Sequence, residues 1–421
     1  MNSPPAKSPH SESGVVPTSL LILLGELIAE ILSRLPVKTL MQMKCVCKLL
    51  KTLISHPSFA KLHLQRSPRN THVLLSPIWY GAANIYSSVV PIPVSRLLES
   101  PLAIRYYEPY HHRLREFNIH NDPYYRLLNM GCDHIVGSCN GLICLGGGSL
   151  SRPKHWFRLW NPATNTLSEK LGNLTNFCRL TFGYDVLNDT YKVVAFSDNT
   201  VKVFNLSDNV WKDIPCFPIV PYDIHCIHRY PLVHNNGVYV SDSINWLAIR
   251  DKTDYEWNDI TIDQFVIVSL DLATETYRQL LPPSGFVEVP PIEPSVIVLM
   301  DYLCFSHRFR ETHFVIWKMM EFGVQESWTQ FLKISFQNIQ IDYGVSDNLA
   351  YGSQLFLLPL CVSESTNTLI MASIQQGFLS IHNQHVILYN WKDNKVEQIA
   401  TDNEISWFNT MDYVESLVSA S

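Results

Sequence analysis

The feature that most constrains the fold is a change of sequence texture near residue 72. From there to about residue 400, proline, aromatic and β-branched residues dominate, and no stretch shows the spacing of a long amphipathic helix. Runs such as Tyr191–Phe196, Val201–Phe204 and Phe265–Leu270 predict strands. We therefore expect a mainly antiparallel all-β domain over residues 72–400.

A weak repeat runs through this domain. Each copy has an apolar strand, a polar turn and a second short apolar strand, often with an aromatic residue. The copies lie at Phe157–Asn165, Val203–Trp211, Val268–Tyr277, Val315–Phe322 with Trp328, and Ile387–Asn394. Their spacing is roughly 45 to 70 residues, and the shorter intervals match a four-stranded propeller blade. We predict a β-propeller of about six or seven kelch-like, irregular blades, with a stacked pair of β-sandwiches as the alternative.

The N-terminal part of the chain has a different character. Residues 1–17 are rich in Ser and Pro and are expected to be disordered. Residues 18–66 predict three helices, at 20–35, 37–54 and 59–64, and Pro36 ends the first. The first two share an apolar stripe: Leu27, Ile28, Ile31, Leu32, Leu35, Val37, Leu40, Met43, Cys47, Leu50 and Ile54. A module this small does not bury its apolar surface alone, so we expect it to dock onto a partner. The chain as a whole is thus an α+β multidomain protein.

Composition narrows the class of protein. Hydrophobic residues make up 46% of the 421 residues and charged residues 17%, as in soluble globular proteins. The apolar stretch Leu20–Leu35 contains Glu26, Glu30 and Arg34, so it is too polar to span a membrane, and no signal-peptide pattern flanks it. The ten cysteines are scattered, several of them in apolar runs, as reduced core cysteines are. We expect a cytoplasmic or nuclear protein without a membrane partner.

The distribution of charge limits the class of partner. The formal net charge of -6 speaks against a nucleic-acid partner for the whole chain. One local run of basic residues has no Asp or Glu within it: Arg34, Lys38, Lys44, Lys48, Lys51, Lys61, Arg66 and Arg69. Such a run suits an acidic protein partner.

Familiar patterns of catalytic and metal-binding residues are missing from the sequence. His111, His112, His120 and His134 lack a Cys or carboxylate at zinc spacing and are interpreted as loop residues. Gly146–Ser149 is not followed by the Lys-Ser/Thr of a P-loop, and no Gly-x-Ser-x-Gly elbow occurs. We predict a non-catalytic protein with no cofactor and no metal site.

Two sets of segments resemble a known family. The first set resembles the F-box: Glu26–Leu40, Lys44–Lys48 and Leu53–Phe59. The second resembles the F-box-associated interaction domain of plant F-box proteins, often called F-box/kelch-repeat proteins: Gly137–Cys144, Leu159–Asn165 and Thr181–Val194. Together the two resemblances extend over most of residues 20–400.

The resemblance implies the substrate-recognition subunit of a Skp–cullin–F-box ubiquitin ligase. In this family the F-box binds a Skp-family adaptor, which joins a cullin scaffold, and the C-terminal domain selects a protein for ubiquitination. The ligase chemistry lies in other subunits, so the chain is expected not to be an enzyme. The residues implied to bind the adaptor are Leu27, Ile28, Ile31, Leu32, Leu35, Pro36, Val37, Leu40, Val46, Cys47, Leu50 and Ile54.

Three positions depart from the family pattern. Leu24 and Gly25 stand where Pro and Asp are usual, and Leu50 stands where Trp is usual. These departures leave open a degenerate F-box protein that acts as a ligase-independent binding module. A further alternative is a propeller enzyme or sugar-binding protein with an unrelated helical leader, which would need clustered carboxylates or metal ligands.

Target-binding residues are expected on loops at one end of the β domain. The candidate loops are Gly81–Arg115, Pro218–Arg229 and Arg250–Ile260. The third contains Tyr255 and Trp257, which are the candidate substrate-binding residues because exposed aromatic residues favour recognition. Residues 401–421 are interpreted as a C-terminal tail.

Overall fold

A computed structural model of the chain describes residues 18–68, 72–80, 85–98, 106–107, 114–115, 127–128, 132, 134–149, 152–175, 179–197, 200–219, 221, 237–250, 257–339, 355–375, 384–399 and 405–420. The chain divides into two compact units, Met1–Ser67 and Pro68–Ser421. The predicted disordered leader, residues 1–17, lies outside the described residues. None of the described helices is long and apolar enough to cross a membrane.

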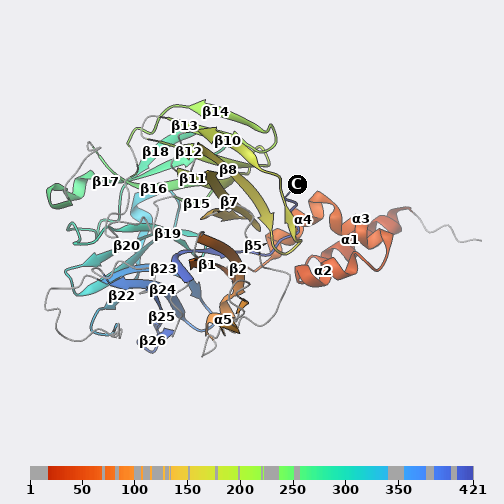
Figure 1. Ribbon diagram of the computed structural model, residues 1–421. Helices are drawn as coiled ribbons and strands as arrows, with labels where there is room; N and C mark the ends of the chain where they lie inside the picture. Colours follow the sequence, from red (N-terminus) through yellow and green to blue (C-terminus); the bar gives the residue numbers. More distant parts are fainter. Residues whose placement is uncertain are drawn as a thin grey trace, which may run out of the picture. The chain divides into compact units, whose positions relative to one another are not determined.

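The described part of the helical unit contains four helices, α1 (Thr18–Leu32), α2 (Val37–Met43), α3 (Lys48–Ser55) and α4 (Pro57–Arg66) (Figure 1). The single helix predicted over residues 37–54 is instead two helices. Between them, Cys47 has extended backbone (φ −155°, ψ 162°), the conformation of a residue that precedes a helix. On either side of this break, Leu40 and Ile54 are both fully buried in the core of the unit.

Helix α4 is fixed to the end of α1 by polar contacts. The His63 imidazole donates from Nε2 to the Leu35 carbonyl oxygen at 2.9 Å. The Arg66 guanidinium donates to the Glu30 backbone oxygen at 3.2 Å, and also to Ser33 Oγ and the Glu30 carboxylate. The bond from Arg66, together with one from Ser33 Oγ, satisfies the Glu30 carbonyl in the last turn of α1, whereas the Leu35 carbonyl lies in the segment that follows α1.

The β unit is a six-bladed β-propeller, whose sheets are arranged radially (Figure 1). From the centre outward, blade 1 is β27 (Ile405–Tyr413), β1 (His72–Tyr80), β2 (Ile85–Pro93) and β5 (Leu127–Leu128). Blade 2 is β6 (His134–Cys139), β7 (Leu142–Ser149), β8 (Arg152–Asn161) and β10 (Leu171–Thr175), with β9 (Thr166–Leu167) also paired to β8. Blade 3 is β11 (Arg179–Asp185), β12 (Thr190–Phe196), β13 (Val201–Asn205) and β14 (Val210–Ile214).

The remaining blades follow in chain order. Blade 4 is β15 (Val238–Val240), β16 (Ser243–Ile249), β17 (Phe265–Asp271) and β18 (Thr276–Leu280). Blade 5 is β19 (Ser295–Leu299), β20 (Tyr302–Phe309), β21 (His313–Met319) and β22 (Trp328–Ser335). Blade 6 is β23 (Leu355–Ser363), β24 (Thr368–Gln375), β25 (Gln384–Asn390) and β26 (Lys395–Ile399). Between β2 and β5 lie helix α5 (Val94–Leu98) and a two-stranded sheet of β3 (Tyr106–Tyr107) and β4 (Leu114–Arg115). The propeller prediction is confirmed.

The ring of blades is closed by the C-terminal part of the chain. β27 pairs antiparallel with β1, with Tyr413 opposite His72. The innermost strands contact one another in turn around the ring: β6, β11, β15, β19, β23 and β27. Residues 401–421 are therefore not the predicted tail, because 405–413 form the innermost strand of blade 1. Pairing β27 with β1 leaves neither strand with an open edge on that side.

The sequence repeat corresponds to the hairpin between the third and fourth strands of blades 2 to 6. In four of these hairpins an Asn or Asp ends the third strand, and its side-chain oxygen accepts backbone N–H groups of the turn: Asn161, Asn205, Asp271 and Asn390. Four residues further on, each turn has a residue with positive φ: Asn165, Asn209, Glu275 and Asn394. This local chemistry recurs in blades 2, 3, 4 and 6, which is why the repeat is visible in the sequence.

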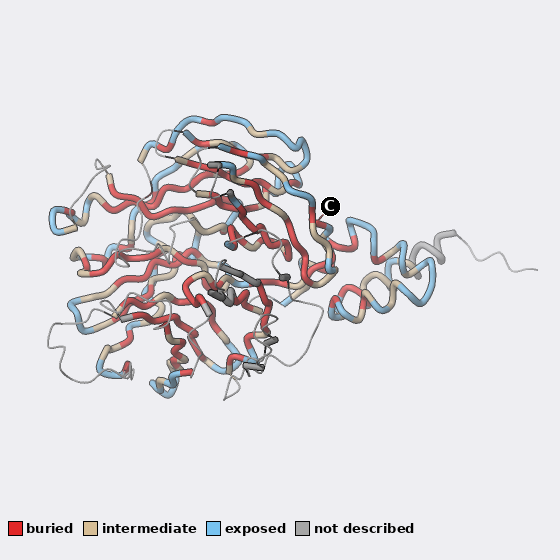
Figure 2. Tube along the Cα trace, viewed as in Figure 1, coloured by how far each residue is buried: buried red, intermediate tan, exposed pale blue. Residues whose placement is uncertain are grey.

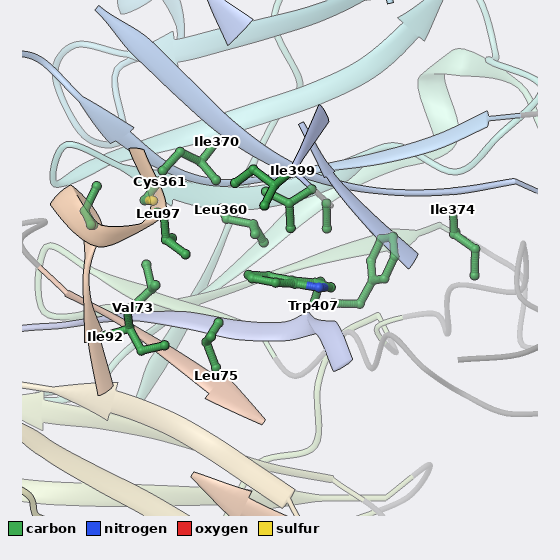
Figure 3. Close-up of a cluster of buried hydrophobic side chains, with 14 of the residues drawn as sticks. Val73, Leu75, Ile92, Leu97, Leu360, Cys361, Ile370, Ile374, Ile399 and Trp407 are labelled. Carbon is green, nitrogen blue, oxygen red and sulfur yellow. The ribbon is translucent and has the colours of Figure 1, made fainter. Parts of the chain in front are cut away.

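The blades are held together by apolar contacts. Trp407 on β27 is fully buried and lies between side chains of blade 1 and blade 6, shown in Figure 3. The labelled neighbours come from β1, β2, α5, β23, β24 and β26: Val73, Leu75, Ile92, Leu97, Leu360, Cys361, Ile370, Ile374 and Ile399. Buried residues follow the strands, whereas exposed residues concentrate at the turns (Figure 2).

The two ends of the propeller carry different connections. Short turns join the first to the second strand and the third to the fourth in most blades, and they emerge at one end. Because neighbouring strands are antiparallel, the connections between second and third strands and between blades emerge at the opposite end. We call that end the long-connection face. Its described residues include 215–219, 257–264, 281–294, 310–312 and 336–339.

Candidate functional site

The helical unit exposes large apolar side chains. Leu27 and Ile31 on α1 are 53% and 64% exposed, and they lie one helical turn apart on the same side of that helix. Val46 in the α2–α3 turn is 73% exposed and Leu49 on α3 is 67% exposed. We call these four residues the exposed apolar set. Apolar groups that stay in water on so small a unit are typical of a surface that another protein covers.

The predicted adaptor-binding residues divide into three groups by burial. Four are buried in the core of the unit: Leu32, Val37, Leu40 and Ile54. Three are half-buried: Ile28, Leu35 and Leu50. Five are exposed: Leu27, Ile31, Pro36, Val46 and Cys47. A single stripe therefore supplies both the core and the exposed surface, which the periodicity of the sequence does not separate.

Leu49 is a surface residue that the sequence reasoning missed. It directly precedes Leu50, which the stripe does include. Adjacent residues on a helix point in directions about 100° apart, so Leu49 falls outside a stripe drawn at helical spacing. The signal that indicates it is the pair of leucines itself, because one helix face cannot bury both.

The basic residues of this unit are partly paired internally. Glu30 forms a salt bridge with Arg34 at 2.9 Å and another with Arg66. The hydrogen bonds from Arg66 and then Arg34 lower the pKa of Glu30. Four lysines of the predicted basic run are exposed: Lys38, Lys48, Lys51 and Lys61. The helical unit thus presents positive charge beside the exposed apolar set.

Lys44 behaves differently from the other lysines. Its side chain is half-buried, and burial, with a smaller contribution from the Lys51 charge, lowers its pKa. Lys44 and Lys51 come from opposite sides of the α2–α3 break. An acidic group placed here would relieve the repulsion between the two ammonium groups.

In the β unit, Trp257 has a positioning role. It lies in a short 3₁₀ helix (Trp257–Asp259), is half-buried, and donates from Nε1 to the Pro290 carbonyl oxygen at 2.8 Å. Its ring packs edge-on against Phe265, with the centroids 5.9 Å apart. Trp257 thus ties two connections of the long-connection face together. Tyr255, the other candidate, lies outside the described residues.

Two of the three candidate loops begin at the long-connection face. Pro218–Arg229 follows blade 3, and Arg250–Ile260 joins β16 to β17 in blade 4. The third candidate, Gly81–Arg115, is not one loop, because it contains strand β2 and helix α5. Its Pro, Ser and Tyr content gives the segment a loop-like composition, yet residues 85–87 and 90–93 pair with β1. Within the described part of the chain, no group of three or more His, Cys, Asp or Glu side chains is placed to hold a metal ion.

Comparison with known proteins gives two kinds of match. Residues 21–62, which include most of α1 and all of α2 and α3, match the F-box domain family. The chain is 28% identical over 350 residues to a putative F-box protein of Arabidopsis thaliana, a match that covers 81% of this chain and 68% of that protein. It is 26% identical over 328 residues to an F-box/kelch-repeat protein of the same plant, over 73% of this chain and 78% of that one.

Solved structures match only distantly. TolB from Acinetobacter baumannii aligns with 87% of this chain and 72% of its own, at 8% sequence identity and a TM-score of 0.43. The propeller assignment rests on the strand pairing of this chain itself.

Proposed function

We propose that this chain, in which an F-box domain is followed along the sequence by a β-propeller, is the substrate receptor of a Skp–cullin–F-box ubiquitin ligase. The F-box domain binds a Skp-family adaptor and, through it, a cullin scaffold. The propeller binds the protein to be ubiquitinated, and the catalytic chemistry resides in other subunits. The complex acts in the cytoplasm or the nucleus.

The observation that carries the proposal is the exposed apolar set on the F-box domain. Burying a valine, leucine or isoleucine side chain fully is worth about 1.5–3 kcal/mol relative to leaving it in water. Four such side chains supply a strong driving force for docking, from which the cost of association is subtracted. The exposed lysines next to the set speed the encounter with an acidic adaptor.

Two departures from the family pattern, Gly25 and Leu50, weaken this docking but leave the exposed apolar set in place. Gly25 lies within α1, where glycine is less favourable than alanine by about 0.5–1 kcal/mol. A Cβ added at Gly25 would meet no atom within 4 Å. Leu50 is half-buried beside the exposed Leu49, so part of its side chain remains available to a partner.

The test is calorimetric titration of the full chain with a purified Skp-family adaptor. Ile31→Asp and Leu49→Asp each place a charge in the exposed apolar set, and each should weaken binding at least tenfold. Leu187→Asp is the matched control, because Leu187 is 81% exposed on the propeller. Equal affinity of all four proteins would rule out the exposed apolar set as the docking surface.

A parallel titration of Leu50→Trp distinguishes the second candidate function. If the native chain does not bind the adaptor but Leu50→Trp does, the F-box is degenerate and the propeller acts outside the ligase. If neither protein binds, the adaptor assignment itself is wrong.

A further inference from the structure

The turn between β11 and β12 of blade 3 exposes two apolar side chains. Val186 is 53% exposed, and Leu187, at 81%, is the most exposed large apolar side chain in the described part of the chain. The turn emerges at the end of the propeller opposite the long-connection face. The Asp185 carboxylate fixes its backbone by accepting the Asn188 N–H at 3.0 Å. A fixed turn that holds a valine and a leucine in water is typical of a surface that another molecule covers.

Three half-buried tyrosines lie beside this turn. Tyr184 directly precedes Asp185 on β11, and its ring centroid lies 4.9 Å from that of Tyr191 on β12. Tyr239, from β15 of the next blade, donates its hydroxyl to the Tyr184 carbonyl oxygen at 2.8 Å. The accessible part of each ring therefore adds aromatic surface next to the apolar turn, and this surface extends from blade 3 to blade 4.

Two exposed aspartates border the tyrosines. The Tyr184 hydroxyl donates to Asp189 Oδ1, and the Tyr239 hydroxyl donates to Asp242 Oδ1 at 3.3 Å. Asp189 belongs to the β11–β12 turn, and Asp242 belongs to the β15–β16 turn of blade 4. Because Tyr239 also bonds to Tyr184, the two carboxylates are tied to one pair of tyrosines. The blade 3–4 turn surface consists of Val186, Leu187, Asp189 and Asp242.

The charge of this surface is negative. The nearby Lys192 ammonium is buried, 2.9 Å from Asp185 and 3.0 Å from Glu275, and the Lys212 ammonium lies 2.6 Å from Glu275. The turns 186–189 and 241–242 themselves contain no Lys or Arg. The first short turn of each blade from 3 to 6 exposes a carboxylate: Asp189, Asp242, Asp301 and Glu364.

We propose that the blade 3–4 turn surface binds a basic segment of the target protein, which places lysine or arginine on the two aspartates and an apolar side chain against Leu187. The proposal deepens the receptor function proposed above and rests on it for the identity of the partner as a ubiquitination target. Carboxylates form charge-assisted hydrogen bonds with lysine and arginine, and tyrosine rings attract the same cations. Contact with an apolar side chain removes Leu187 from water.

A basic protein segment fits this surface better than the other kinds of ligand. Exposed carboxylates repel the phosphodiester backbone of a nucleic acid and the side chains of an acidic protein. A metal ion would use the carboxylates but not the exposed Leu187, and among the described residues no group of three or more His, Cys, Asp or Glu side chains is placed to hold one. The remaining occupant is a second copy of this chain, which the experiment tests separately.

The experiment measures fluorescence anisotropy of three labelled peptides with the full chain. The first peptide has arginine, lysine and leucine residues among glycines and serines. The second has glutamate at the basic positions, and the third has serine at the leucine positions.

Three variants of the chain test the surface. Asp189→Asn and Asp242→Asn each remove one charge, and asparagine also adopts the positive φ of these residues (54° and 60°), so the turns are preserved. Leu187→Ser removes the apolar contact and carries the test if an asparagine variant does not fold in a thermal unfolding check. The matched controls are Glu364→Gln, an exposed carboxylate of blade 6, and Leu281→Ser, which is 47% exposed after β18.

We expect the first peptide to bind more tightly than the other two, and each of the three variants to weaken its binding about fivefold while both controls leave it unchanged. The proposal is overturned if the first peptide does not bind, if either of the other peptides binds as tightly, or if a control weakens binding as much as its matched variant. A dimer of the chain alone that Leu187→Ser dissociates in sedimentation would also overturn it, because the occupant would be a second copy.

Adaptor titration of the same samples separates this proposal from the receptor function. Binding to the adaptor without binding to the first peptide removes only the blade 3–4 turn surface as a target site. Binding to the peptide without binding to the adaptor removes only the ligase role.

Discussion

His307 is a titratable side chain held neutral inside blade 5. Its Nδ1 donates to the Arg308 carbonyl oxygen at 3.1 Å, and its Nε2 accepts from Trp317 Nε1 at 3.2 Å. The Phe286 ring packs edge-on against it, with the centroids 5.1 Å apart. Burial lowers the pKa of His307 from 6.5 to about 4, although the Arg308 carbonyl and the Glu288 charge act in the opposite direction. Both ring nitrogens are thus assigned, one as donor and one as acceptor.

This lowered pKa predicts a pH dependence of stability. Between pH 6.5 and 4 the unfolded chain binds a proton at His307 that the folded chain does not bind. The free energy of unfolding therefore falls as the pH is lowered through this window, by up to about 3 kcal/mol from this residue. Denaturant unfolding at several pH values measures the slope, and His307→Gln, which keeps an acceptor for Trp317, should flatten it.

His307→Phe provides the control for this experiment. It removes the titrating group and also the acceptor for the Trp317 N–H, so it should be less stable than His307→Gln but show the same flattened slope. A His307→Gln protein with the wild-type slope would show that other groups produce the pH dependence.

Single residues also mark how far the sequence predicts burial in the helical unit. The apolar stripe contains both Leu40 and Ile31, but the first is buried and the second is exposed. The hydrophobicity of a residue does not say which neighbour will cover it. That depends on the break between α2 and α3, which sets the direction of α3 and leaves Leu49 in solvent. The sequence therefore predicts which residues are apolar at helical spacing, but not which of them are buried.

At the scale of elements, blades 3 and 4 are joined by a buried ionic contact. Lys192 on β12 is 4% exposed, and its ammonium lies 2.9 Å from Asp185 Oδ2 and 3.0 Å from Glu275 Oε1. It also donates to the Leu272 carbonyl oxygen at 2.6 Å. Burial alone would raise the pKa of Asp185, but the hydrogen bonds from Asn188 and Lys192 lower it. The first carboxylate belongs to blade 3 and the second to the β17–β18 turn of blade 4.

Removing this lysine should destabilise the propeller. Lys192→Met leaves Asp185 buried without its counter-ion, and breaking a buried ion pair typically costs about 3–5 kcal/mol. Denaturant unfolding measures the loss, and Glu275→Gln, which removes the blade 4 carboxylate, combined with Lys192→Met should cost less than the sum of the two single changes. Lys202→Met is the control, because the Lys202–Asp213 pair lies at the surface and should contribute less than about 1 kcal/mol. Additive single effects would show that the contact does not couple the blades.

Local chemistry explains which elements the sequence predicts well. The Asn140–Gly141 turn between β6 and β7 has positive φ at both residues (51° and 82°), as a two-residue hairpin turn requires. The Asn and Asp turns of the outer hairpins follow equally local rules. The break in residues 37–54 was not predicted, because the segment contains no Pro or Gly and its apolar spacing continues through the break. Tertiary packing, not propensity, decides that break.

At the scale of the whole propeller, closure of the ring by β27 is the feature that cannot be predicted from the sequence. β27 follows the last complete blade and resembles any short apolar strand, and its partner β1 begins at His72, more than 300 residues earlier. No local signal specifies a pairing over such a distance. After β27, residues 414–420 continue along blade 2, where Val414, Ser416 and Leu417 are buried. This C-terminal segment forms a strap, residues 414–420, that joins blade 1 to blade 2.

Asn161 holds the strap. It is fully buried, and its Nδ2 donates to the carbonyl oxygens of Ser416 at 3.0 Å and Val418 at 2.6 Å. Its Oδ1 accepts from the Ala163 backbone N–H at 2.9 Å and so forms the turn of blade 2. At Gly141, an added Cβ would lie 2.1 Å from Ser416 Oγ, so the strap also requires glycine there. One asparagine therefore serves both the local turn and the closure of the ring.

Three variants distinguish the contribution of β27 to ring closure from the contribution of the strap. Truncation after Asn403 removes β27 entirely, so the shortened chain should lose cooperative unfolding, because blade 1 loses its innermost strand. Truncation after Tyr413 should keep the propeller but lower its stability. Asn161→Asp keeps the turn acceptor and loses both donors to the strap, which should cost about 1–3 kcal/mol per buried carbonyl left without a partner. In the chain truncated after Tyr413 the same substitution should have little effect, since the strap is absent. If Asn161→Asp is equally costly in both backgrounds, the residue stabilises only its own turn, and the ring is closed by β27 alone.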